Sequence, residues 1–385
     1  MHHRVPTIGF RGARPPFGAA MECLALHVDW HDVFMADAPF QSVVPDHRQT
    51  LTCAYPPPVA PLPKGILRPR FSVMLPTFEP DTALERALSS VLAQAPAADQ
   101  MQIAVVDDGS RTADVHRLVR AVDPAGRVEI LLHRQRLGLG RNWNRAIGLA
   151  RGELIHLLHQ DDYVLPGFYA RIERGFRSAP GVGMAFCRSR IVDGRERIIK
   201  TASRQQWTAG ILANWLPRIA ERQRVQTPAA VVPRATYERL GGFRSDLCQA
   251  LDWEMWVRIA ARTQVWYDPA VLAVYRRHGR SESTRLLSSG AVWPDLIHTI
   301  AINSGTLPED IRGRVRQSSA RWHAGSAIRT AEKQIACGEF DAAGTTLEHL
   351  PRLLELLPRA GDRSLPLRRA GVLQDRLRSA RRRAA

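Results

Sequence analysis

Two pairs of adjacent aspartates are the residues best suited to chemistry in this sequence. Asp161 and Asp162 follow a short apolar run, LIHLL at 154–158, and Asp107 and Asp108 follow another, IAVV at 103–106. Ligands of open α/β sheets bind outside the carboxyl ends of the strands. Adjacent carboxylates repel each other and need a cation or strong hydrogen-bond donors nearby. The pair Asp161–Asp162 therefore predicts a site for a metal ion and a diphosphate at a strand end.

The elements around these aspartates alternate between strands and helices. Strands are predicted at 71–75, 103–106, 127–133 and 154–158, and the helices between them carry apolar residues at helical spacing. A capping box, Thr82 to Glu85, is predicted to begin the first helix. Such alternation is typical of a parallel, doubly wound half-domain. Its strand ends share one edge, so Thr77 and Glu79 are expected near the two aspartate pairs.

Beyond Pro166 the alternation is looser. The pattern predicts a helix at 168–176, two strands or a hairpin at 182–186 and 190–193, and a surface helix or loop at 204–224 carrying Trp207 and Trp215. It further predicts a strand at 227–232, an amphipathic helix at 252–262 and a last strand at 271–275. From 288 onward the chain is predicted to be helical, with a turn at 338–341.

Composition narrows the class of protein. The 385 residues include 54 basic and 37 acidic side chains, a net charge of +17, which suits anionic partners such as nucleotide diphosphates, an anionic membrane surface or nucleic acid. The five cysteines lack metal-ligand spacing and indicate a reducing compartment. There is neither a secretory apolar segment nor a run of the roughly 18 apolar residues that a membrane span needs. We expect a cytoplasmic protein with a proline-rich extension (1–65), an α/β domain (66–287) and a helical region (288–385).

From Phe71 to about Ser283 the chain resembles the family-2 glycosyltransferases of the GT-A fold. The motifs that carry the resemblance occur in the family's order: SVMLPTFEP, VVDDGS, GLGRNWNRAIGLARGELIHLLHQDD, RATYERLGGF, ALDWEMWVRIA and YRRHGRSES. They cover a little over half of the chain. The resemblance implies a GT-A fold and a nucleotide-diphospho-sugar donor. It also implies a divalent cation, Mn²⁺ or Mg²⁺, and transfer of a hexosyl unit with inversion at the anomeric carbon.

The resemblance assigns the metal site. Asp161 is the first-choice ligand, and Asp162 is a second ligand or a partner that contacts the donor. His159 stands where the family usually has an acidic residue, and it can bind Mn²⁺ or the diphosphate. His278, in the late YRRH string, is expected as a third ligand or a diphosphate contact. Carboxylates and phosphate oxygens suit a hard cation. The structural alternative is that one aspartate only caps a helix.

The resemblance also assigns a general base. An inverting transfer needs a group that accepts the proton of the attacking hydroxyl. Asp252 matches the family's acidic motif, and Glu254 is the fallback base. Leu251 replaces the glutamate that many relatives have before the aspartate. The structural alternative for Asp252 is again a helix cap.

The remaining predicted contacts are with the nucleotide-sugar. Asp107 and Asp108 suit a base N–H or a ribose hydroxyl, although an Asp-Gly sequence is also a common turn signal. Many relatives carry asparagine where Glu79 stands. Arginines on the helix after the glycine-rich turn could meet a phosphate, and the alternative is a solvated helix face. The complete set is Pro76, Thr77, Glu79, Asp107, Asp108, Arg141, Asn144, Arg145, Gln160, Asp162 and Arg276.

Two other classes of function stay open. A nucleotidyltransferase also uses carboxylates and a metal ion, but it needs a glycine-rich basic loop near the first strand, which PTFEPDT is not. A catalytically degenerate GT-A fold could serve as a binding module. We expect no nucleic-acid partner, because no zinc-finger or RNA-binding signature is present. The acceptor is expected to be a glycan, a lipid-linked sugar or a small molecule of cell-wall or polysaccharide biosynthesis. The basic tail at 376–383 would hold the enzyme at the inner face of a membrane.

Overall fold

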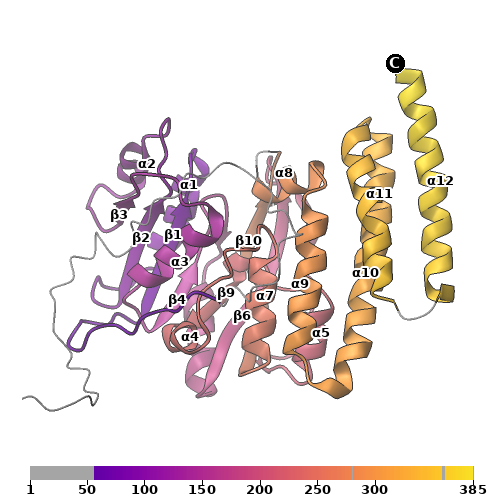
Figure 1. Ribbon diagram of the computed structural model, residues 1–385. Helices are drawn as coiled ribbons and strands as arrows, with labels where there is room; N and C mark the ends of the chain where they lie inside the picture. The colour runs from indigo at the N-terminus through magenta and orange to yellow at the C-terminus, as the bar shows by residue number, and fades with distance from the viewer. Residues whose placement is uncertain (1–55, 280, 358–359, 385) are drawn as a thin grey trace, which may run out of the picture. The chain divides into compact units, whose positions relative to one another are not determined.

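The computed structural model describes residues 56–279, 281–357 and 360–384, and they belong to one compact unit. Residues 1–55 of the predicted extension lie outside the described residues. The α/β class is confirmed, because helices cover both faces of a ten-stranded mixed sheet and a helical region follows it (Figure 1). The boundary expected at residue 287 stays a prediction.

The first half of the sheet is parallel, as the alternation predicts. Its strands lie in the order β3-β2-β1-β4, and the register sets Thr77 beside Asp107. The elements of this half are β1 (Phe71–Thr77), α1 (Ala83–Leu92), β2 (Met101–Asp107), α2 (Val115–Val122), β3 (Glu129–Leu132), α3 (Leu139–Leu149) and β4 (Leu154–Leu157).

The second half contains antiparallel pairs but keeps the same polar edge. β9 lies antiparallel between β4 and β6, and β10 pairs parallel with β6. β4, β6 and β10 therefore end at one edge of the sheet. This half contains β5 (Tyr163–Val164), α4 (Phe168–Ser178), β6 (Val182–Asp193), β7 (Ile198–Thr201), β8 (Gly210–Ile211), α5 (Trp215–Glu221), η1 (Thr227–Ala229), β9 (Ala230–Pro233), α6 (Arg234–Leu240), α7 (Leu251–Ala260), β10 (Gln264–Arg277) and α8 (Glu282–Ser288).

Three local predictions are wrong. The segments 182–186 and 190–193 form one strand, β6, whose hairpin partner is β7. Trp215 is buried, with its ring centroid 5.3 Å from that of Phe186, rather than lying at the surface. Thr82 makes no capping hydrogen bond, and Asp81 Oδ1 accepts one from the backbone N–H of Ala83 at 2.9 Å instead.

Two hydrophobic clusters lie on opposite faces of the sheet. α1, α2 and α4 contribute to one cluster, and α3, α5, α6 and α7 contribute to the other. The second cluster continues into the C-terminal helices, so these helices extend the core of the α/β part. They are α9 (Val292–Thr306), α10 (Glu309–Ala336), α11 (Phe340–Glu355) and α12 (Ala360–Ala384). A turn between two helices is confirmed, but it lies at 337–339 rather than at 338–341, because α11 already begins at Phe340.

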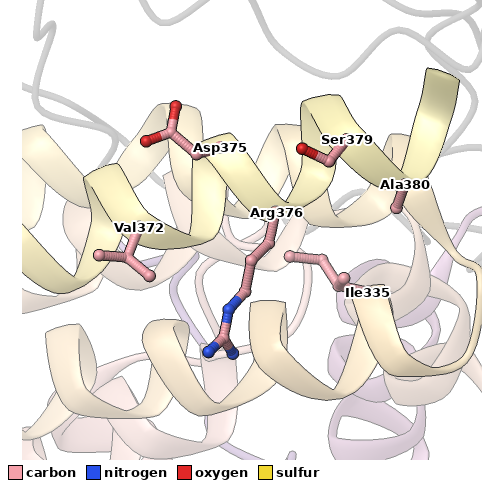
Figure 2. Close-up of a pocket in the computed structure, with 6 residues that line it drawn as sticks. All are labelled: Ile335, Val372, Asp375, Arg376, Ser379 and Ala380. Atoms are coloured by element: carbon pink, nitrogen blue, oxygen red, sulfur yellow. The ribbon is translucent and has the colours of Figure 1, made fainter.

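The last helix packs through one narrow face. Ala370, Leu373 and Leu377 of α12 are buried. Figure 2 shows a hollow between α10 and α12 that is lined by Ile335, Val372, Asp375, Arg376, Ser379 and Ala380. None of these lining residues comes from the sheet edge, so the hollow is separate from the aspartate pairs. Within the described part of the chain, no helix is both long enough and apolar enough to span a membrane.

Candidate active site

The cluster His159–Asp162 is fixed by the strand before it and by the loop after β1. His156 of β4 is fully buried, with its ring nitrogens 3.1 Å from the hydroxyl of Tyr169 and 3.0 Å from the carbonyl oxygen of Pro228. Gln160 accepts a hydrogen bond from the backbone N–H of Phe78 at 2.8 Å and donates one to the carbonyl of Phe78 at 3.2 Å. The end of β4 is thereby tied to the end of β1.

The end of β10 meets the Asp161–Asp162 pair. The backbone N–H of Arg276 donates to Asp162 Oδ1 at 2.9 Å, and His278 Nε2 lies 2.9 Å from Asp161 Oδ2. Burial and the charge of Asp161 raise the pKa of Asp162 to about 6. Burial also opposes ionisation of Asp161, but its contact with His278 and the charge of His159 hold its pKa below the ordinary value. The two neighbouring carboxyls therefore differ in acidity.

His159 completes a group with the chemistry of a cation site. Its ring stacks on Trp143 with centroids 4.8 Å apart, and its Nδ1 lies 3.2 Å from Asp162 Oδ2. Burial disfavours the imidazolium, yet the contact with Asp162 and the charges of both aspartates raise its pKa above the ordinary value. One ligand atom from each of His159, Asp161 and Asp162 lies within 4.8 Å of the others, and His159 Nε2 is buried without a hydrogen-bond partner. The two carboxylates suit Mn²⁺ or Mg²⁺, whereas the imidazole adds a nitrogen ligand that Mg²⁺ does not favour.

Asp107 and Asp108 shape the loops at the end of β2. Asp107 accepts hydrogen bonds from the hydroxyls of Thr77 (3.2 Å) and Ser110 (2.6 Å) and from the N–H of Ser110 (2.8 Å). Asp108 accepts from the N–H groups of Leu137 (2.6 Å) and Gly138 (2.9 Å), and burial raises its pKa. Gly138 has φ +86°, a backbone conformation that favours glycine. The aspartates thus hold the two loops on either side of β2.

Glu79 stabilises the same edge from the loop after β1. Its carboxylate accepts from the hydroxyl of Thr112 and from the N–H groups of Arg111 (2.8 Å) and Ala113 (3.0 Å). These contacts, that of Thr112 first, lower the pKa of Glu79. Its φ of +45° lies in the left-handed region, where asparagine is more readily accommodated than glutamate.

Helix α3 carries predicted donor contacts in different surroundings. The amide of Asn144 bonds both ways with the backbone of Phe243, donating at 2.8 Å and accepting at 2.7 Å. This commits Asn144 to joining α3 to the loop before α7. Arg145 is half-buried, and burial lowers its pKa, whereas Arg141 is exposed. The guanidinium of Arg276 lies 3.3 Å from Glu196 and donates to the carbonyl of Gly194.

The carboxylate of Asp252 is fixed in the first turn of α7. Its Oδ1 accepts from the N–H of Trp253 at 2.7 Å, and its Oδ2 accepts from the hydroxyl of Thr227 at 3.2 Å. Burial raises the pKa of Asp252 to about 6, and the charge of His159 acts on it in the opposite direction. Asp252 and His159 are therefore close enough to influence each other electrostatically.

Glu254 is engaged in a different way. It is 3% exposed and forms a bidentate ion pair with Arg258, at 2.9 and 2.7 Å. Arg258 also donates to the carbonyl oxygens of Leu240 and Gly242. A bidentate pair of this kind fixes the orientation of the carboxylate along α7.

Sequence reasoning missed three residues that position the site. Trp143 stacks on His159, Thr227 bonds Asp252, and Ser110 bonds Asp107. The sequence offered a signal for Ser110, because it is the last residue of the DDGS motif that contains Asp107. Thr227 had none, because 25 residues separate it from Asp252 in the sequence.

Comparisons with known proteins agree with this geometry. The sequence model of the family described as "Glycosyl transferase family 2" matches residues 72–247. "Uncharacterized protein MT1568" of Mycobacterium tuberculosis is 32% identical over 233 residues, which are 58% of this chain and 72% of that protein. "Uncharacterized protein y4gI" of Sinorhizobium fredii is 27% identical over 203 residues, 51% of this chain and 21% of that protein.

A solved structure has a similar fold. The crystal structure of S. aureus TarS 1-349 in complex with UDP-GlcNAc aligns with a TM-score of 0.59 and 18% identity, over 81% of this chain and 90% of that one. The family match and this fold agree with each other. The chain belongs to glycosyl transferase family 2 and is a glycosyltransferase of the GT-A fold.

Proposed function

We propose that this glycosyltransferase moves a sugar, with inversion, from a nucleotide-diphospho-sugar to an acceptor hydroxyl, and that it uses a divalent cation. One observation carries the proposal. The ends of β4 and β10 bring Asp161, Asp162 and His278 together, while Asp252 lies within electrostatic range of His159 and has a pKa of about 6. A site for a leaving diphosphate and a base for the incoming hydroxyl are therefore neighbours.

The donor would lie along the edge formed by β1, β2 and β4. S. aureus TarS was crystallised with UDP-GlcNAc, which supports a nucleotide-sugar as the class of donor. A carboxylate offers about four lone-pair positions, and Asp108 uses two of them on backbone N–H groups. Asp108 thus keeps capacity for a ribose hydroxyl or a base N–H. We assign Thr77 and Asp107 to the same nucleoside side, and Arg141 and Arg145 to the phosphates.

His159, Asp161 and Asp162 are the residues that would hold Mn²⁺ or Mg²⁺, with His278 beside Asp161. When bound, the cation supplies positive charge that stabilises the departing diphosphate. Asp161, whose pKa is lowered, is ionised and ready to bind at neutral pH. Asp162, with a pKa of about 6, is also mostly ionised there.

Asp252 would take the proton of the acceptor hydroxyl. The hydroxyl oxygen forms a bond to the anomeric carbon, the bond from that carbon to the diphosphate oxygen breaks, and the proton moves to the carboxylate. A base works best when its pKa lies near the working pH, and burial shifts Asp252 in that direction. Thr227 and the N–H of Trp253 orient the carboxylate for this step.

The acceptor would be a glycan, a lipid-linked sugar or a small molecule with a free hydroxyl. Helix α12 exposes Arg368, Arg378 and Arg382. Exposed basic side chains attract anionic lipids. We propose that this helix brings the enzyme to a membrane surface at which a lipid-linked acceptor is presented.

A thermal-shift screen of nucleotide-sugars with and without Mn²⁺ tests the donor and the cation together. A donor that binds the folded chain raises the melting temperature, by an amount that grows with its concentration. We expect Mn²⁺-dependent stabilisation by at least one nucleotide-sugar, and loss of it in Asp161→Ala. Transfer is then assayed with the stabilising donor. The absence of any shift with nucleotide-sugars and nucleoside diphosphates, together with no cleavage of a nucleotide-sugar in the presence of Mn²⁺, would favour the catalytically degenerate fold.

A further inference from the structure

Asp295 of α9 caps the helix that carries the candidate base. Its Oδ1 accepts from the N–H of Cys248 at 2.8 Å, and its Oδ2 accepts from the N–H groups of Gln249 (2.9 Å) and Ala250 (2.8 Å). Ala250 immediately precedes α7 and brings no capping side chain of its own. A helix start leaves its first N–H groups without partners inside the helix. Here a buried carboxylate, 45 residues from Ala250 along the chain, binds the N–H group of the N-cap residue Ala250 and those of the two residues before it.

Hydrogen bonds and the backbone between them join Asp295 to Asp252. Asp295 fixes the backbone at 248–250, this backbone leads directly into the first turn of α7, and the N–H of Trp253 in that turn orients Asp252 Oδ1. The Trp253 side chain is also held, since its indole N–H donates to the carbonyl of Ile219 at 2.7 Å and its ring packs 5.1 Å from that of His323 in α10. The helices after residue 288 therefore fix the first turn of α7 at its end and at its side.

The loop before α7 is also held from the donor side. Asn144 of α3 binds both backbone groups of Phe243, and a side chain at Gly242 would approach Asn144 Oδ1 to 2.3 Å. The loop is thus clamped between α3 and α9. A displacement of the loop would move α7 relative to the edge where the donor is proposed to bind.

We propose that Asp295 is a positioning residue for glycosyl transfer, which holds Asp252 in line with the acceptor hydroxyl by capping α7. Asp295 lies outside the matched range 72–247 and contacts none of the proposed donor residues. Its effect on the reaction passes through the placement of α7. This inference rests on the proposed role of Asp252.

The test is Asp295→Asn, which has the same size but retains a single carbonyl oxygen to accept hydrogen bonds. We expect kcat for transfer to fall about 10- to 100-fold, because a displacement near 1 Å at a reacting group has an effect of that size. The dissociation constant of the nucleoside diphosphate with Mn²⁺, measured by calorimetry, should be unchanged. Amide hydrogen exchange at 248–253 should become faster. Asp295→Ala should show a larger fall in kcat, and the asparagine variant carries the test if the alanine variant does not fold.

The matched control is Asp246→Asn. Asp246 also joins the loop to α9, through His298 at 3.4 Å, and it pairs with Arg244, but it contacts none of the N–H groups at 248–250. We expect a lower melting temperature with kcat within about twofold of the wild type. Equal kcat in the two variants, measured well below their melting temperatures, would overturn the proposal. If the wild type itself transfers no sugar, the proposed function fails, and hydrogen exchange still decides whether Asp295 caps α7.

Discussion

At the scale of the residue, Asp252 and Glu254 are two carboxyls on one turn of α7 with opposite surroundings. Asp252 is held by a hydroxyl and one N–H group and has a pKa raised by burial, whereas Glu254 is neutralised by Arg258. Removing one partner of a buried ion pair strongly destabilises a fold. Replacing a carboxyl whose ionisation is disfavoured by burial with an amide, in contrast, costs little stability. The two residues should therefore respond oppositely to the same substitution.

Asp252→Asn should stop transfer and stabilise the fold. We expect kcat to fall by about 10² to 10⁴, the usual contribution of a general base, with donor binding kept. A carboxyl whose pKa rises on folding favours the fold below its unfolded pKa, and this contribution is lost as pH rises through about 6. The melting temperature of the variant should therefore exceed that of the wild type at pH 8 but not at pH 4.

Glu254→Gln is the matched comparison. It should lower stability by about 3 kcal/mol, because Arg258 is left without its carboxylate, and kcat of the folded enzyme should stay near the wild-type value. If Asp252→Asn retains transfer and Glu254→Gln loses it, the role of base passes to Glu254.

The pH profile gives a second test of Asp252. The base must be ionised, so kcat at saturating donor and Mn²⁺ should fall about tenfold per pH unit below about pH 6. Glu254→Gln should keep the same profile. An acid limb centred near pH 4 would mean that the base is a carboxyl other than Asp252.

At the scale of the element, Asn144 decides whether α3 contacts the donor or only supports a loop. Its two hydrogen bonds to Phe243 predict that Asn144→Ala destabilises the fold by about 1–3 kcal/mol, since two backbone groups lose their partner. Chemical denaturation measures this loss. The affinity for the nucleotide-sugar, measured by calorimetry below the melting temperature, should change little. A large loss of affinity with unchanged stability would support the donor contact that the sequence predicts for Asn144.

The sequence predicted the elements that follow from periodicity and strand-end chemistry. The parallel half-sheet and the placement of Asp107 and Asp161 at strand ends follow from apolar runs and from the polar residues after them. The insertion of β9 between β4 and β6 did not follow, because strand order depends on pairing between distant segments. The capping of α7 by Asp295 was equally hidden, since a cap from another helix leaves no local signature.

At the scale of the whole molecule, charge is the feature with an experimental consequence. The net charge is +17, and α12 exposes Arg368, Arg378 and Arg382 while burying Ala370, Leu373 and Leu377. Changing the three exposed arginines to glutamine keeps the buried face. We expect this triple variant to lose flotation with vesicles of phosphatidylglycerol, and the wild type to lose it as salt rises.

The control for this surface uses arginines that pair with other helices. Arg369 lies 3.0 Å from Glu332, and Arg381 lies 2.7 Å from Asp341. Their replacement by glutamine should weaken the packing of α12 more than it weakens binding to lipid. Equal flotation of the wild type and the triple variant would show that α12 does not bring the enzyme to membranes.

Strand order also has a consequence for synthesis on the ribosome. β1 to β4 emerge first and can pair with one another, but the outer edge of β4 stays open until β9 arrives. His156 likewise lacks its contact with the carbonyl oxygen of Pro228 until that residue, 72 positions later in the chain, has been synthesised. At about 5–20 residues per second, this interval lasts about 4–14 s. Throughout this interval, the nascent chain presents the unpaired edge of the apolar strand β4 next to the incomplete Asp161–Asp162 cluster. We expect the nascent chain to depend on chaperones most strongly during this interval.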